Sequence, residues 1–98
     1  MKGQKIKVNL KIPENLQPIY INSANVSFKP DEFAIAFAHI YPISNNIQGI
    51  VKAVIAMTPQ YTKLLTEILE ENLRKYEQQF GEIKLPNEKS VKNLTYRT

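Results

Sequence analysis

The feature that most constrains this chain is a long amphipathic helix signal in its second half. Between Thr58 and Gly81, apolar residues recur at spacings of three and four, which places them in one stripe along a helix. The stripe consists of Tyr61, Leu64, Leu65, Ile68, Leu69, Leu73, Tyr76 and Phe80. Because the opposite face is polar, we expect a helix over residues 59–80 that lies on a sheet or on a partner.

Both ends of this helix carry recognisable signals. The hydroxyl of Thr58 can cap the free N–H groups of the first turn, and Pro59 suits the first helical position because its missing N–H has no partner there. Gly81 is expected to end the helix, since glycine readily adopts the left-handed conformation that stops helices. The boundaries are therefore predicted from the residues themselves.

Four shorter stretches before the helix have the patterns of strands. Strict alternation of apolar and polar side chains in the first is typical of a half-buried strand, and turns rich in proline, aspartate and asparagine separate the stretches. Asn22 lies among apolar neighbours, so its amide needs a partner on nearby backbone or across an interface. The expected strands cover residues 5–12, 19–28, 32–41 and 47–57.

Short strands joined by short loops and followed by a helix describe an α+β fold. We expect a four-stranded antiparallel meander with one long amphipathic helix, near the carboxyl terminus, packed on one face. A chain of 98 residues provides one modest core. Residues 1–81 are therefore predicted to form a single domain, and residues 82–98 an irregular tail.

The last two expected strands are apolar on both faces. Phe33, Ile35 and Phe37 can cover the helix stripe, whereas the alternating alanines need something else to pack closely against them. A monomer rarely exposes that much apolar surface, and a symmetric dimer that stacks sheet on sheet would cover it. The predicted self-association face consists of Ala34, Ala36, Ala38, Ile40, Ile50, Val54 and Ala56.

The polar side of the first expected strand is rich in lysine, and the net charge of the chain is +4. Lys5, Lys7 and Lys11 could bind the phosphates of a nucleic acid. Strands that bind nucleic acids usually also present aromatic side chains for base stacking, and this one has none. Lysines on an edge strand also discourage unwanted pairing. Both interpretations of the lysines stay open.

Composition argues against catalysis. The chain has no cysteine and one histidine, which excludes disulfides, thiol chemistry and cysteine-based zinc sites. His39 has no nucleophile motif beside it and is interpreted as an ordinary strand residue. Asp31 and Glu32 are adjacent in a turn, which favours solvated acids over a catalytic pair. We expect no catalytic residue, no metal ligand and no cofactor.

The sequence lacks the marks of a membrane protein. No apolar run approaches the roughly 18–20 residues of a spanning helix. The first ten residues lack the continuous apolar block of a signal peptide. We therefore expect a cytoplasmic protein without membrane contact.

A set of short motifs adds a family resemblance. They are Tyr20 and Asn22, Glu32-Phe33, Phe37, Met57-Thr58-Pro59, Lys63-Leu64-Leu65, Asn72, Tyr76-Glu77 and Phe80-Gly81. With these residues the chain resembles, from Ile19 to Gly81, a small prokaryotic family of unknown function. The resemblance implies a compact strand-rich domain that ends in a helix, and it implies no activity. The order of four strands and a helix is also similar to the fold of SecB-like export chaperones.

These observations lead to one functional expectation and one alternative. We expect a self-associating protein-binding or assembly module, most simply a homodimer, which could also bind a partner protein. The alternative is a small basic nucleic-acid-binding domain that uses the lysines of its first strand.

Overall fold

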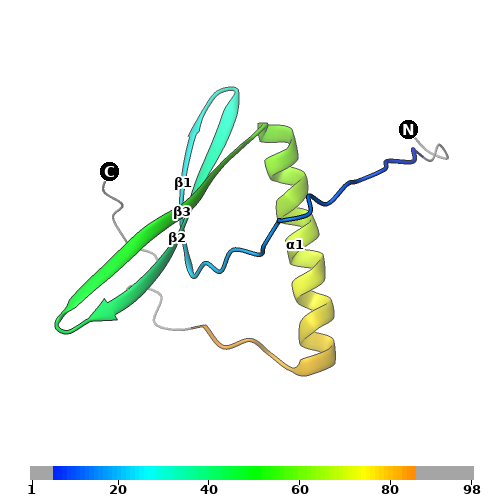
Figure 1. The fold of residues 1–98 in the computed structure, drawn as a ribbon. Coiled ribbons are helices and arrows are strands. Elements are labelled where there is room, and N and C mark those ends of the chain that lie inside the picture. The colour runs from blue at the N-terminus through cyan, green and yellow to red at the C-terminus, as the bar shows by residue number, and fades with distance from the viewer. Residues whose placement is uncertain (1–5, 86–98) are drawn as a thin grey trace.

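The computed structural model describes residues 6–85. Three strands, β1 (Ser23–Lys29), β2 (Glu32–Ile43) and β3 (Asn46–Met57), are followed by helix α1 (Pro59–Phe80). The strands form one antiparallel sheet in the order β1-β2-β3 (Figure 1). The α+β class, the antiparallel sheet and the helix that follows it are confirmed, but the prediction of four strands is wrong.

The missing strand is the first one. Residues 6–12 have no regular structure, and the side chains of Ile6, Val8, Leu10 and Ile12 are 69–86% exposed. Alternation alone does not form a strand, because the N–H and C=O groups of a strand need a neighbouring strand to bond. The likeness to SecB-like folds, which depends on four strands, therefore lacks its first strand in the part of the chain that the structure describes.

Asn22 explains why β1 begins at Ser23 and not at residue 19. Its side-chain Nδ2 donates to the carbonyl oxygen of Ile40 at 2.9 Å, and its Oδ1 accepts from the Ile40 N–H at 2.8 Å. The Asn22 backbone N–H donates to the carbonyl of Ala38 at 3.1 Å. The side-chain amide thus occupies the groups that a further strand residue would bond. The prediction that Asn22 bonds nearby backbone is confirmed.

Two tight hairpins join the strands. Pro30 and Asp31 form the first turn, and Ser44 and Asn45 form the second. The second turn is shorter than predicted, because Ser44 adopts a φ of 54° and so allows a two-residue connection. β2 continues past the end of β1 and includes Pro42 there. Because no β1 residue lies beside Pro42, its missing N–H interrupts no hydrogen bond on the β1 side.

Helix α1 has the predicted boundaries. The Thr58 hydroxyl accepts a hydrogen bond from the Tyr61 N–H at 3.1 Å. Gly81 has a φ of 101°, and its N–H donates to the Glu77 carbonyl at 2.9 Å. The Glu77 carboxylate also accepts from the Ile83 N–H at 2.9 Å, which holds the chain after the helix. Both capping predictions are confirmed.

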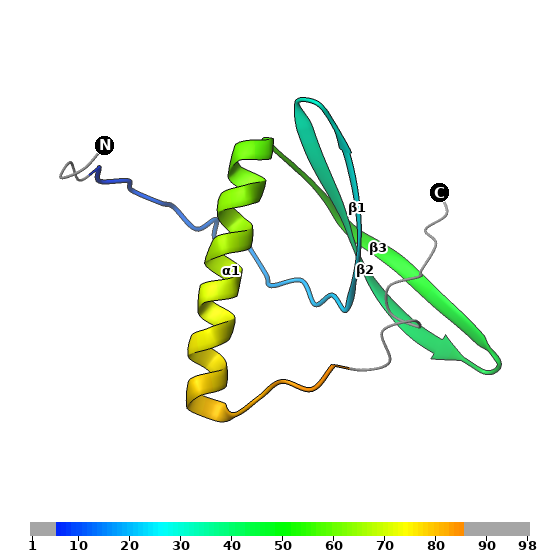
Figure 2. The same cartoon turned by 180° about the vertical axis from the view of Figure 1, so that it is seen from behind.

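Helix α1 does not pack closely on the sheet. The two meet where β3 ends and then diverge (Figures 1 and 2). No residue of α1 is buried. Along its stripe Leu65 is half-buried, and the exposed residues run from 40% at Ile68 to 68% at Phe80. Among the described residues Ala38, 3% exposed, is the one hydrophobic residue that is buried. The expected packing of the helix on one face is therefore not made within a single chain.

Candidate functional site

The pairing of β2 with β3 decides which apolar residues share a face of the sheet. Directly paired residues of an antiparallel sheet lie on the same face. Ala34 pairs with Ala56, and Ala36 pairs with Val54. The register therefore brings six of the seven predicted self-association residues together. We call this the alanine face: Ala34, Ala36, Ala38, Ile40, Val54 and Ala56.

A β-bulge separates the seventh residue from the others. The register shifts between Phe37, which pairs with Ala53, and Ala38, which pairs with Val51. Lys52 is therefore the extra residue of β3. A bulge inserts one residue into a strand and so exchanges the faces of all residues beyond it.

The consequence is that Ile50 and Val51 lie on the faces opposite to those predicted. Ile50 pairs with His39, away from the alanine face, and Val51 takes its place there. Gly49 supports this arrangement, because a Cβ built on it would lie 3.2 Å from the Ile40 side chain. The local hint of the bulge in residues 47–57 is Gly49, because an isolated glycine in a strand often marks a bulge. It does not show that Lys52 is the extra residue.

The other side of the sheet carries larger apolar side chains, among them Phe33, Ile35 and Phe37, which were expected to cover the helix stripe. We call it the aromatic face, made of Ala24, Val26, Phe28, Phe33, Ile35, Phe37, Ala53, Ile55 and Met57. On the opposite side, β1 adds Ser23, Asn25 and Ser27 to the alanine face. The pairing of β1 with β2 adds Ala24, Val26 and Phe28 to the aromatic face. Phe28 is 75% exposed although its ring centre lies 5.4 Å from that of Phe33.

His39 lies in a small aromatic cluster at one end of the sheet. The Tyr20 ring meets it edge-on at a centroid distance of 5.3 Å, and the Tyr41 ring lies 5.6 Å away. Edge-to-face packing of this kind favours a fixed ring orientation. The half-buried His39 thus has a packing role, as an ordinary strand residue would.

The remaining polar candidates do not converge on one place. Asp31 lies in the first turn and Glu32 is the first residue of β2. Lys7 and Lys11 lie in the irregular segment 6–12, and Lys5 lies outside the described residues. Within residues 6–85, the structure does not place the lysines on a strand face.

No strand of the described residues pairs with the outer edge of β3. β3 is twelve residues long and stands at the end of the strand order. None of the backbone hydrogen bonds found between described residues joins its outer side. Lys52 is its one charged residue. A long apolar edge of this kind is a template for pairing with another strand.

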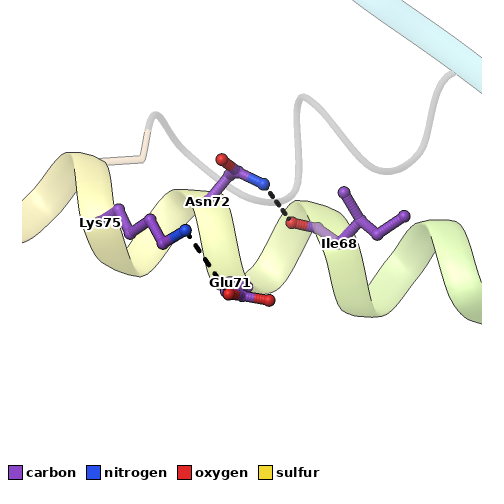
Figure 3. Close-up of polar contacts among 4 residues, drawn as sticks. All are labelled: Ile68, Glu71, Asn72 and Lys75. Atoms are coloured by element: carbon purple, nitrogen blue, oxygen red, sulfur yellow. Dashed lines mark hydrogen bonds and ion pairs between the residues drawn. The ribbon is translucent and has the colours of Figure 1, made fainter. Parts of the chain in front are cut away.

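The outer side of α1 is solvated and contributes little energy. Lys75 and Glu71 form an exposed ion pair at 3.5 Å, and the Asn72 amide donates to the Ile68 carbonyl at 2.8 Å (Figure 3). An exposed helix pair of this type contributes roughly 0.2–0.5 kcal/mol. The helix therefore offers its apolar stripe, and not its charged side, as an interaction surface.

Comparison with known proteins assigns the family. Residues 1–85 match the model of a family described as "Protein of unknown function (DUF3467)". The chain belongs to this family. No curated protein and no solved structure matches it. In the described part of the chain, no helix is both long enough and apolar enough to cross a membrane.

Several residues that carry the family resemblance lie where elements begin or end. Asn22 bonds Ile40 at the start of β1, and Thr58 caps α1. At the end of α1, the Glu77 backbone carbonyl accepts from the Gly81 N–H, and its carboxylate accepts from the Ile83 N–H. In this DUF3467 protein these positions hold the elements in place, while the exposed apolar faces lie between them.

Proposed function

We propose that this DUF3467 protein is a self-associating assembly or protein-binding module, in which a second copy covers the stripe of α1 and the apolar faces of the sheet. The observation that carries the proposal is the surface of the single chain. Among residues 6–85, Ala38 is the one hydrophobic residue that is buried, and no residue of α1 is buried. A compact domain of this size buries about two thirds of its surface around a core.

The open apolar surface extends over several elements. The exposed apolar residues lie on β1, β3 and α1 as well as in residues 6–22. Interfaces of obligate homodimers are similarly extended and apolar, and they bury about 2,000–5,000 Å² in total. A partner that covers both the helix and the sheet supplies the core that one chain lacks.

Apolar burial outweighs charge in this proposal. Completing the burial of a half-exposed leucine contributes about 1 kcal/mol, at roughly 25 cal/mol per Å². The exposed Glu71–Lys75 pair contributes less and is weakened by salt. Association is therefore expected to persist when the salt concentration is raised.

The alternative function, nucleic-acid binding, receives less support. Its three lysines were expected on one strand face, but Lys7 and Lys11 lie in an irregular segment. The proposal assigns no catalysis and no cofactor to the protein, and it keeps the expected cytoplasmic location. Binding of a further partner protein would use the same apolar faces.

The test is the solution mass of the full chain, measured by light scattering on a size-exclusion column at low and high salt over a dilution series. The expected result is a dimer or larger at both salt concentrations. The control, with Lys5→Gln, Lys7→Gln and Lys11→Gln, should have the same mass. A monomer throughout would overturn the proposal. Nucleic-acid absorbance that the control loses, and that high salt removes from the wild type, would favour the alternative.

A further inference from the structure

Two unsatisfied features of the chain complement one another. Within the described residues 6–85, residues 6–12 have the pattern of a strand but no neighbouring strand, and the outer edge of β3 has the groups to bond a strand but none beside it. Each feature is unusual in a stable protein, because exposed apolar strands and free edges both promote pairing.

We infer that residues 6–12 of one copy add to the outer edge of β3 in a second copy and form its fourth strand. This inference rests on the proposed self-association and names the segment that makes part of the contact. It also restores the strand that the sequence predicts, in the partner's sheet and not in the chain's own.

Backbone bonding and length support this pairing. The segment is seven residues long, β3 is twelve residues long, and Pro13 ends the segment where a strand would end. An added strand satisfies its own N–H and C=O groups together with those of the edge. The same contact also shields Ile6, Val8, Leu10 and Ile12, which are otherwise among the most exposed apolar side chains of the chain.

The polarity of the two faces sets the orientation of the segment. β1 places Ser23, Asn25 and Ser27 on the alanine face, so polar side chains already border that side. Alternation then puts Lys7, Asn9 and Lys11 on the alanine face and the apolar row on the aromatic face. The added strand thus enlarges the larger apolar surface.

The path of the chain favours a second copy over the chain's own β3. Towards the amino terminus the chain, blue in the figures, runs past α1 to the side away from the sheet (Figures 1 and 2). Its own β3 therefore lies behind it, on the other side of the helix. A neighbouring molecule is the partner that this direction serves.

Direct pairing of β3 with β3 of the second copy is less suitable. Lys52 lies near the middle of the strand and forms the bulge. A symmetric antiparallel pair centred there would bring two lysines close together, and like charges across strands destabilise a sheet. That arrangement would also leave residues 6–12 uncovered.

The first test is hydrogen exchange on the full chain with Val8→Pro and Asn9→Pro. The N–H groups of neighbouring strand residues point to opposite sides. Either residue 8 or residue 9 therefore donates to β3, and one of the two prolines removes that donor. We expect the outward amides of β3 to exchange about tenfold faster or more, with α1 less affected. The control, Lys7→Gln with Lys11→Gln, keeps the strand pattern and should match the wild type.

The second test identifies which molecule provides the strand. A benzophenone side chain placed at Asn9 is irradiated in a mixture of isotopically light and heavy full chains. Cross-links from the benzophenone to β3 of the other isotope support the inference. Cross-links only within one chain, or only to other elements, would overturn it.

The outcomes separate the two proposals. If the wild type is a dimer and its β3 protection is the same with both prolines, the strand addition fails and the proposed self-association stands. If the wild type is a monomer at every concentration, both fail.

Discussion

The helix α1 and the segment 6–12 are both amphipathic by sequence, yet only one of them becomes a regular element in the single chain. α1 forms over its predicted length, from Pro59 to Phe80, although none of its residues is buried. Residues 6–12 stay irregular despite strict alternation. The difference is that a helix bonds its own backbone, whereas a strand depends on a neighbour.

The comparison also shows what the two regions share. Each presents an apolar row to solvent, and each is expected to gain a partner when a second copy binds. Isolated helices and strands are marginal in water, so tertiary packing supplies most of their stability. The exposed apolar rows of α1 and of residues 6–12 therefore indicate where a second copy would bind.

The largest effect is expected for a substitution in the apolar stripe of α1. Ile68→Asp places a charge in the middle of the apolar stripe, where Ile68 is 40% exposed in the single chain. If a second copy covers this residue, association should weaken by about 2–4 kcal/mol, because the carboxylate must either be buried without a partner or hold the two copies apart at this position. Sedimentation equilibrium over a dilution series measures it.

The matched control is Glu70→Asp, which introduces the same side chain on the polar side of α1. It should leave the association constant unchanged. Equal association for both variants would show that the stripe is not part of the interface.

A smaller effect is expected where the first segment joins the sheet. Asn22→Ala removes both side-chain hydrogen bonds to Ile40. Because Asn22 is exposed, we expect a loss of about 1–2 kcal/mol in the free energy of unfolding. Urea denaturation measures it at a fixed protein concentration.

The comparison variant, Asn22→Asp, keeps an acceptor for the Ile40 N–H but sets a carboxylate oxygen against the Ile40 carbonyl oxygen in place of the Nδ2 donor. It should therefore also be clearly less stable than the wild type. An alanine variant as stable as the wild type would mean that the Asn22 amide does not hold the start of β1.

The smallest effect concerns the helix cap. Thr58→Ala removes the oxygen that accepts from the Tyr61 N–H, which should destabilise the fold by about 1 kcal/mol. Thr58→Ser keeps this oxygen and should recover most of the loss. Thermal unfolding followed by circular dichroism measures both. Equal midpoints for Thr58→Ala and Thr58→Ser would show that the cap contributes nothing.

The sequence predictions were correct where the interacting residues are close in the chain, and the errors arose where the residues are far apart. The ends of α1 depend on Thr58 and Gly81, whose partners are three and four residues away, and both ends were predicted correctly. The exchange of Ile50 and Val51 depends on the bulge at Lys52, which exists only when β3 pairs with β2. Gly49 indicates an irregularity in residues 46–57, but no local pattern places the extra residue at Lys52.

The candidate surfaces divide in the same way. Of the seven residues that alternation predicted for the self-association face, six lie together on the alanine face. Alternation also grouped Phe33, Ile35 and Phe37 on the opposite face, but only the pairing of β1 with β2 brings Phe28 beside Phe33 and Val26 beside Ile35. Alternation gives side-chain direction only within a regular strand, whereas the bulge and the neighbours of a strand follow from pairing.

The sequence by itself determined the helix, its caps and the presence of apolar strands, because neighbouring residues decide helix bonding and side-chain alternation. Only the tertiary structure decided the number of strands, the position of the bulge and the openness of both the sheet and α1. Strand pairing and core formation join residues far apart in the chain. Their free energy therefore depends on which partners are present, and residues 6–12 have none in the part of their own chain that the structure describes.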